Sequence, residues 1–161
     1  MKRLLFLLLL LLCAGTSNAQ CVDESRFPND YYACPGFNPV CGCDNVTYRN
    51  YCAAYNWAAL STWTDNTVCG GFFFDFYPTA VSFFPGTFNL YMKSPGSATM
   101  YIFDNFGILR DQRNFIATYN GQVFTEELQV NTLDYGLYIM IVQAAGEKQT
   151  MKFSKVVQTG Q

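Results

Sequence analysis

Cysteine is the residue type in this chain whose number and spacing could do chemistry. Cys41 and Cys43 are separated by one residue, and Cys52 follows nine positions after Cys43. Six cysteines lie from Cys21 to Cys69, and none follows. Thiols at such spacings can form disulfides, hold a metal ion or act as a redox pair. Because four further cysteines are near and the chain has no histidine, disulfides are favoured over a metal clip or a redox pair.

The N-terminal segment indicates where these cysteines fold. Two cations at positions 2–3 precede the unbroken apolar run of residues 4–12, and Ser-x-Ala at positions 17–19 provides a cleavage site. We therefore expect a secretory signal peptide over residues 1–19 and an exported mature chain. The apolar run is shorter than the roughly 20 residues of a membrane-spanning helix, so no transmembrane anchor is expected. Cys13 would leave with the signal peptide, and a leucine before it disfavours lipid attachment.

Composition narrows the classes of function. The mature chain keeps 8 Lys and Arg against 12 Asp and Glu, a net charge of −4 without a basic stripe, so nucleic acid is not expected as a partner. The absence of histidine excludes His-based triads and His general bases. We expect no catalytic residue, no metal site, no cofactor and no enzyme activity. The carboxylates of the second half are interpreted as solvated loop or strand-face charges: Asp104, Asp111, Glu126, Glu127 and Asp134.

The mature chain divides at Gly70-Gly71, where the cysteines end and a glycine pair marks a boundary. The cysteine-containing part, residues 20–70, is too short to fold on apolar burial alone and needs covalent bonds. Three disulfides, at about 2–4 kcal/mol each, would supply that stability. The remainder, residues 71–161, is long enough to bury a core without them.

Local signals in the first part predict a loop, a short strand and a helix. The prolines at 35 and 39 exclude a helix over residues 34–39. Asp44-Asn45 favours a turn, residues 46–48 favour a brief strand, and Asn50 can cap a helix that runs through Ala59. Six cysteines allow about 15 pairings, and the residues alone do not choose among them.

The segment "NPVCGCDNVTYRNYC", residues 38–52, resembles the central signature of Kazal-type serine protease inhibitor domains. The resemblance covers the cysteine-containing part and implies pairing of Cys34 with Cys52 and of Cys41 with Cys69, which leaves Cys21 for Cys43. The usual Kazal cysteine just after Cys52 is missing. The Cys-Gly-Cys variant is similar to a bacterial branch of the family.

The Kazal resemblance implies a reactive loop that begins after Cys34 and is shaped like bound substrate. Its residues would be Pro35, Gly36 and Phe37, with Gly36 at the primary specificity position and with Asn50 and Tyr48 supporting the loop. The loop is one residue shorter than in typical members, and glycine offers no side chain to a protease pocket. Two functions therefore stay open: inhibition of an elastase-like or subtilisin-like serine protease, or a non-inhibitory extracellular binding or adhesion module.

The second part alternates apolar and polar residues with the period of β-strands. The short strand-like runs and the turn signals between them predict an antiparallel, Ig-like β-sandwich with aromatic stripes in its core. The expected strands are residues 72–77, 87–92, 98–104, 114–119, 122–130, 135–143 and 149–157.

The end of the chain resembles type A sorting domains of the type IX secretion system. The matching residues are a Gly-x-Tyr strand, a glycine turn and a lysine-bearing last strand: Gly136, Tyr138, Gly146, Lys152 and Lys155. The resemblance implies transport by an outer-membrane secretion machinery. It also implies a secreted or surface-attached protein of an outer-membrane bacterium that travels via the periplasm. An accessory sandwich without a sorting role is the alternative.

Overall fold

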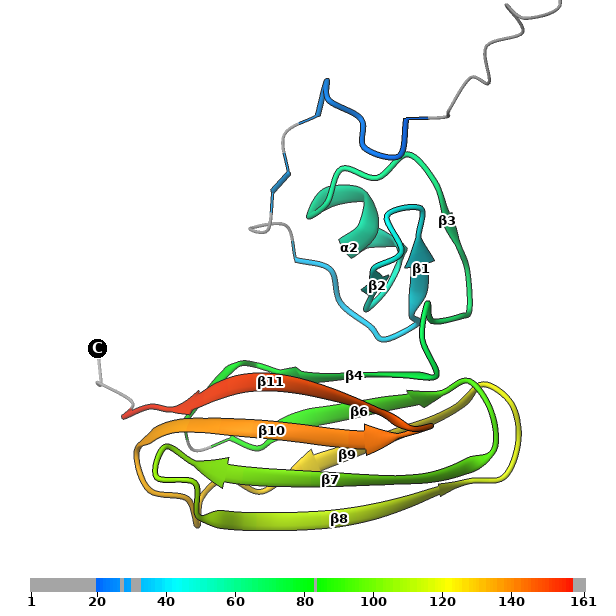
Figure 1. The fold of residues 1–161 in the computed structure, drawn as a ribbon. Coiled ribbons are helices and arrows are strands. Elements are labelled where there is room, and N and C mark those ends of the chain that lie inside the picture. The colour runs from blue at the N-terminus through cyan, green and yellow to red at the C-terminus, as the bar shows by residue number, and fades with distance from the viewer. Residues whose placement is uncertain (1–19, 27, 30–32, 83, 158–161) are drawn as a thin grey trace, which may run out of the picture.

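The computed structural model describes residues 20–26, 28–29, 33–82 and 84–157. The expected signal peptide, residues 1–19, lies outside the described residues. The described chain is mostly β-strand, with one short helix and three disulfides. Figure 1 shows a cysteine-rich region, residues 20–70, above a two-sheet region, residues 71–157.

The cysteine-rich region is built on a small three-stranded sheet and one helix. The sheet has the order β2-β1-β3, with β1 at Val40–Gly42, β2 at Thr47–Tyr48 and β3 at Trp63–Thr64. The helix, α2, spans Tyr51–Asn56. The apolar core of the cysteine-rich region is small and consists of Val40, Ala54 and Leu60 with four half-buried neighbours. So small a core agrees with the expectation that this region depends on disulfides for stability.

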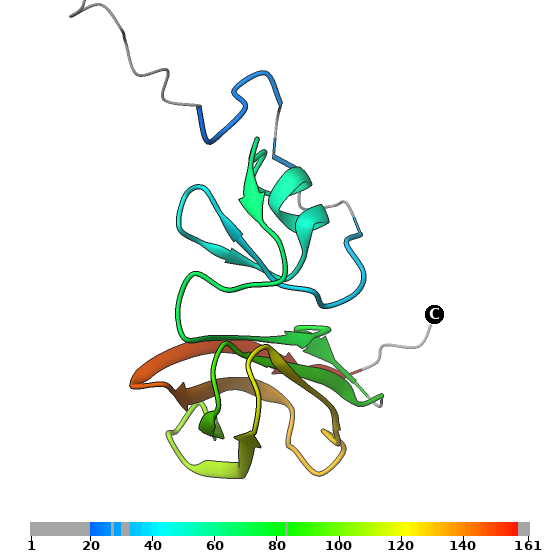
Figure 2. The ribbon, with the colours of Figure 1, turned by 90° about the vertical axis from the view of Figure 1, so that its right-hand side faces the viewer.

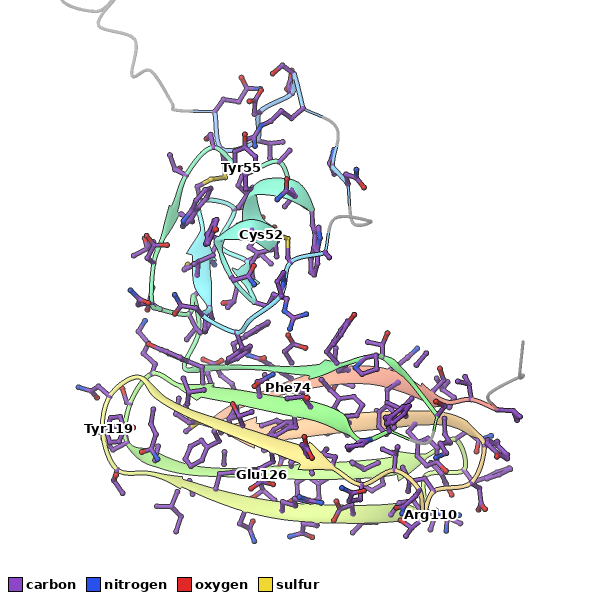
Figure 3. The ribbon with its side chains drawn as sticks, turned by 180° about the vertical axis from the view of Figure 1, so that it is seen from behind. Cys52, Tyr55, Phe74, Arg110, Tyr119 and Glu126 are labelled. Atoms are coloured by element: carbon purple, nitrogen blue, oxygen red, sulfur yellow. A yellow bond between two sulfur atoms is a disulfide. The ribbon has the colours of Figure 1, made fainter. Side chains whose placement is uncertain are left out.

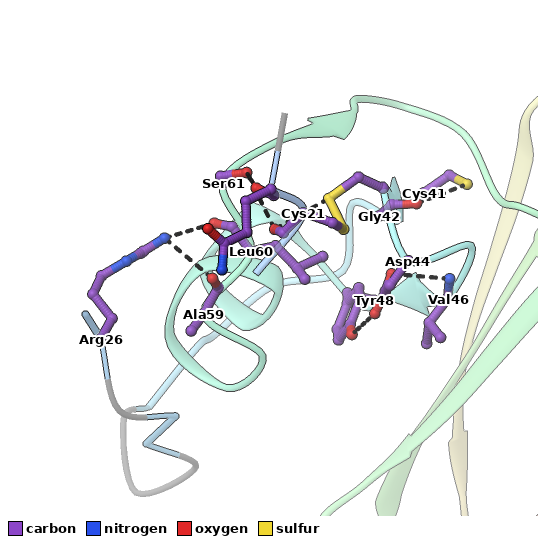
Figure 4. Close-up of a disulfide and its surroundings, with 12 residues drawn as sticks. Cys21, Arg26, Cys41, Gly42, Asp44, Val46, Tyr48, Ala59, Leu60 and Ser61 are labelled. Carbon is purple, nitrogen blue, oxygen red and sulfur yellow. Dashed lines mark hydrogen bonds between the residues drawn. A yellow bond between two sulfur atoms is a disulfide. The ribbon is translucent and has the colours of Figure 1, made fainter. Parts of the chain in front are cut away.

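The prediction that the helix runs through Ala59 is wrong by three residues. Ala59 has a φ of 52°, in the left-handed region, and the Leu60 N–H bonds to the Ala54 carbonyl at 3.0 Å. Trp57 is the C-cap of the helix, and the chain reverses direction at Ala59, where the Leu60 N–H satisfies one of the last helix carbonyls. Arg26 adds hydrogen bonds to the carbonyls of Ala59 and Leu60, at 3.3 and 2.8 Å (Figure 4).

The two-sheet region contains a five-stranded and a three-stranded sheet. The larger sheet has the order β5-β11-β10-β7-β8, and the smaller has the order β4-β6-β9. All pairings are antiparallel except that of β5 with β11. The strands are β4 (Phe72–Tyr77), β5 (Ala80–Val81), β6 (Gly86–Met92), β7 (Gly96–Asp104), β8 (Leu109–Ala117), β9 (Gln122–Leu128), β10 (Gly136–Ala144) and β11 (Glu147–Lys155).

The two sheets face each other across one apolar core (Figures 1 and 2). Ring contacts cross between them, with Phe76 of β4 at 4.9 Å from Phe153 of β11 and Phe88 of β6 at 5.4 Å from Phe115 of β8. Burying each such side chain contributes about 1.5–3 kcal/mol. The expected strand at 72–77 is confirmed, and its alternate residues Phe72, Phe74 and Phe76 belong to this core. Figure 3 shows Phe74 pointing into it.

The interpretation of Asp104 as a solvated charge is wrong. Its residue is only 4% exposed, and its carboxylate accepts hydrogen bonds from the N–H groups of Phe106 and Ile108, each at 2.9 Å. Arg110 also lies 2.7 Å from it. Asp104 therefore holds the β7–β8 turn together. In addition, β8 begins at Leu109, five positions before the expected strand at 114–119.

Candidate functional site

The cysteine-rich region has three disulfides, and two of them fix the loop that follows Cys34. They join Cys34 to Cys52, Cys41 to Cys69 and Cys21 to Cys43, which are the pairs that the Kazal resemblance implies. The first attaches the start of the loop to α2, and the second attaches its end to the link between the two regions. Both ends of the 34–41 segment are therefore fixed covalently.

Asn50 connects this loop to the helix. Its Oδ1 accepts a hydrogen bond from the Ala53 N–H at 2.9 Å, which makes it the N-cap of α2. Its Nδ2 donates to the carbonyls of Pro35 and Gly36, at 2.9 and 3.0 Å, with a longer contact of 3.3 Å to the Cys34 carbonyl. Asn50 is only 5% exposed, so these hydrogen bonds are shielded from water and hold the loop's shape.

The loop itself presents exposed backbone with little side chain. Pro35 and Gly36 are exposed, and Phe37 is half-buried. Gly36 has a φ of 85°, and no atom lies within 4 Å of the position that a Cβ would take. The glycine is therefore explained by its left-handed backbone and not by crowding. This conformation also lies outside the extended region of backbone space.

One side of the loop contacts the outward face of β4. Phe37 stacks on Phe73 with ring centroids 6.0 Å apart and an interplanar angle of 7°. Arg49 forms an ion pair with Asp75 at 3.0 Å, and its guanidinium lies 5.3 Å from the centre of the Tyr77 ring. Positions 73, 75 and 77 share one face of the strand because side chains alternate.

The ion pair is nearly enclosed. The side chains of Arg49 and Asp75 are 13% and 9% exposed. Burial raises the pKa of the Asp75 carboxyl above its ordinary value, and the charge of Arg49 opposes that shift. Beside the pair, a cleft of 860 Å³ separates the loop from β4, with Pro35, Trp57 and Met151 among its lining residues.

Tyr48 and the segment at Cys21 make hydrogen bonds within the cysteine-rich region. The Tyr48 hydroxyl donates to Asp44 at 2.6 Å, and burial together with this hydrogen bond raises its pKa. Ser61 donates to the Cys21 carbonyl at 3.1 Å, next to the Cys21–Cys43 disulfide (Figure 4). Tyr48 also lines the cleft with Pro35.

The residues that match the sorting motif lie on the β10–β11 hairpin and its turn. Gly136 pairs with Lys155 across the two strands, and Gly146 occupies the turn with a φ of 76°. Tyr138 donates to the Asp134 carbonyl at 2.8 Å. Lys155 is buried and donates to the Ser82 carbonyl, whereas Lys152 is exposed.

Sequence reasoning missed the contact residues Phe73, Asp75 and Arg49. The signal was present in "FFFDFY", residues 72–77, where a carboxylate interrupts an aromatic strand. Because side chains alternate along a strand, Asp75 lies on the face opposite the core residues Phe72 and Phe74. The aromatic residues on that same face indicated that another part of the chain packs against it.

The described residues contain no group of three or more His, Cys, Asp or Glu that could hold a metal ion. Within the same residues, no helix has the length and apolarity needed to cross a membrane. Comparison of the chain with protein-family models finds no match, and comparison with curated proteins finds none either. The disulfides indicate folding in an oxidising compartment.

Proposed function

We propose that the chain is an exported two-domain protein that binds a serine protease. Residues 20–70 are a Kazal-like domain that inhibits an elastase-like or subtilisin-like enzyme through the loop from Cys34 to Cys41. Residues 71–161 are an Ig-like sandwich that acts as a sorting domain. The observation that carries the inhibitory function is the contact of the Asn50 amide with the carbonyls of Pro35 and Gly36.

The physical basis of the proposal is preorganisation. A loop that is already ordered loses less conformational entropy when a protease binds it. Disulfides fix both ends of this loop, and the buried Asn50 side chain fixes its middle. A loop built in this way can enter a protease active site and keep its shape after the peptide bond is attacked.

The test is an inhibition panel of the purified fragment 20–70 against elastase-like, subtilisin-like and trypsin-like proteases. Asn50→Ser keeps a side-chain oxygen to cap α2 but removes the amide that reaches the loop, so we expect about tenfold weaker inhibition. Asn56→Ser is the matched control, since the Asn56 amide donates to the Cys52 carbonyl and to the sulfurs of the Cys34–Cys52 disulfide, but to no loop carbonyl. Disulfide mapping and far-UV circular dichroism establish that each fragment is folded.

A second candidate function is a non-inhibitory binding or adhesion module on the same scaffold. It is favoured by the left-handed Gly36 backbone and by the contact of Phe37 with Phe73. This candidate predicts that the fragment inhibits none of the proteases, or that they cut the loop as an ordinary substrate. The same panel therefore separates the two functions.

For the sorting role, the supporting observation is that the motif residues lie on one hairpin with Lys152 exposed. In a host with a type IX secretion system, Lys152→Glu is expected to leave the protein in the periplasm. Lys148→Glu, on the same face of β11, is the matched control. Normal delivery of both variants to the medium or cell surface would contradict the sorting role and favour an accessory sandwich.

A further inference from the structure

We propose that the two-sheet region covers the reactive loop, so that a protease reaches the loop only after the two regions separate. This inference rests on the proposed inhibitory function and adds its regulation. It starts from Phe37, the residue directly after the proposed specificity position Gly36. Phe37 belongs to the segment that a protease must contact, yet its ring is stacked on Phe73 of β4.

Three side chains on β4, which we call the β4 stripe, contact the side of the cysteine-rich region that carries the loop. Phe73, Asp75 and Tyr77 alternate along the strand and share its outward face. Phe73 contacts Phe37, while Asp75 and Tyr77 both contact Arg49. Arg49 immediately precedes the bracing residue Asn50, so the ion pair fixes the loop support as well as the loop.

The size of the remaining space decides whether a protease could still bind. A protease–inhibitor interface buries about 800 Å² on each partner. The cleft between the loop and β4 has a volume of 860 Å³ and is walled by Trp57, Tyr77 and Met151. Pro35 and Gly36 line this cleft and remain exposed. The neighbouring Phe37 is stacked on Phe73, so an enzyme that contacts the residues on both sides of Gly36 would overlap β4.

The link between the regions maintains this arrangement. The Gly71 N–H donates to Glu147 at 3.1 Å, and the Gly71 carbonyl accepts from the Lys93 N–H at 3.0 Å. The Tyr91 hydroxyl donates to the Asn66 carbonyl at 2.9 Å. These contacts hold the chain on both sides of Gly70, so the covered state does not depend on the Phe37 stack alone.

Separation of the regions would expose the loop without loosening it. The disulfides of the loop and every hydrogen bond that Asn50 makes to it lie within the cysteine-rich region. Cleavage at Gly70-Gly71, or a partner that takes the β4 stripe, would therefore release a preorganised loop. The loop would not inhibit a protease until the two-sheet region had been cleaved off or its β4 stripe had bound another partner.

The experiment compares inhibition constants of the full mature chain and of a chain with Phe73→Ala and Asp75→Ala. We expect inhibition by the double variant to be about tenfold tighter or more. Tyr101→Ala is the matched control, because Tyr101 is an aromatic residue on the outward face of the other sheet, where it stacks on Phe103. A flexible Gly-Ser insertion between Gly70 and Gly71 is a second route to separation that leaves every core residue in place.

The outcomes are distinguishable. Equal inhibition by the full chain and both separated variants overturns the covering while the inhibitory function stands. Inhibition by the fragment 20–70 but by neither separated full-length variant shows that these contacts are not what covers the loop. If neither the fragment nor any full-length protein inhibits, the proposed inhibitory function is wrong, and so is the proposal that the two-sheet region regulates it. If the double variant does not fold, the insertion variant alone decides.

Discussion

At the scale of single residues, two requirements conflict at Gly36: a protease pocket favours a side chain there, whereas the backbone conformation favours glycine. A protease pocket would be filled by a side chain at this position, but the φ of 85° is one that L-residues rarely adopt. The Asn50 amide donates hydrogen bonds to the carbonyls of Pro35 and Gly36 at this bend. Glycine is thus required by the shape that Asn50 braces, which explains its place at the proposed specificity position.

Replacing Gly36 tests this explanation. Gly36→Ala should lower the free energy of unfolding by about 1–2 kcal/mol, the cost of a left-handed L-residue. No steric clash adds to it, since nothing lies within 4 Å of the new Cβ. Urea unfolding of the mature chain measures the change. Gly107→Ala, with a φ of 79° and equally open surroundings, should cost as much without altering protease binding. A Gly36→Ala protein as stable as the wild type would contradict the left-handed backbone.

At the scale of elements, the β7–β8 turn depends on one carboxylate. Asp104 ends β7 and accepts from the N–H groups of Phe106 and Ile108 and from Arg110. Burial alone would raise its pKa, but the hydrogen bonds from Ile108, Arg110 and Phe106 outweigh burial and lower the pKa below its ordinary value of 3.8. The ionised form is therefore the one that stabilises the turn.

The pH dependence of stability follows from this direction. Because the folded pKa of Asp104 lies below the unfolded value, its stabilisation is fully present above pH 3.8 and is lost as the pH falls through the folded pKa. Asp104→Asn keeps an oxygen for the two N–H groups but cannot ionise. Urea midpoints measured from pH 5 downwards should fall less steeply for Asp104→Asn than for the wild type. Parallel curves for the two proteins would mean that Asp104 does not carry this dependence.

Some of these elements could be predicted from sequence and others could not, for physical reasons. The strand at 72–77 is visible because burial on one face imposes a period of two. The helix start is visible because Asn50 is a strong N-cap, whereas its early end depends on the left-handed Ala59, which alanine does not signal. Asp104 looked like a surface charge because its burial depends on tertiary packing.

At the scale of the whole molecule, the ion pair between Arg49 and Asp75 joins the two regions. Its partners are far apart in sequence and lie in regions with separate cores. No local pattern could pair them, because the contact exists only after both regions have folded. The same contact places the loop against the β4 stripe, so the stability of the molecule and the access to its candidate site are coupled.

Removing one partner of this pair should destabilise the molecule strongly. Asp75→Ala leaves Arg49 enclosed without its partner, and breaking a buried pair costs about 3–5 kcal/mol. Both side chains are nearly enclosed, at 13% and 9% exposed, so the range for a buried pair applies to them. We expect calorimetry to show one unfolding transition for the mature wild-type chain and two for Asp75→Ala, because the regions then unfold separately. Arg49→Met with Asp75→Leu should recover most of the lost stability, since apolar replacement of both partners leaves no unpaired charge. A single, unshifted transition in Asp75→Ala would show that the regions are held together by other contacts.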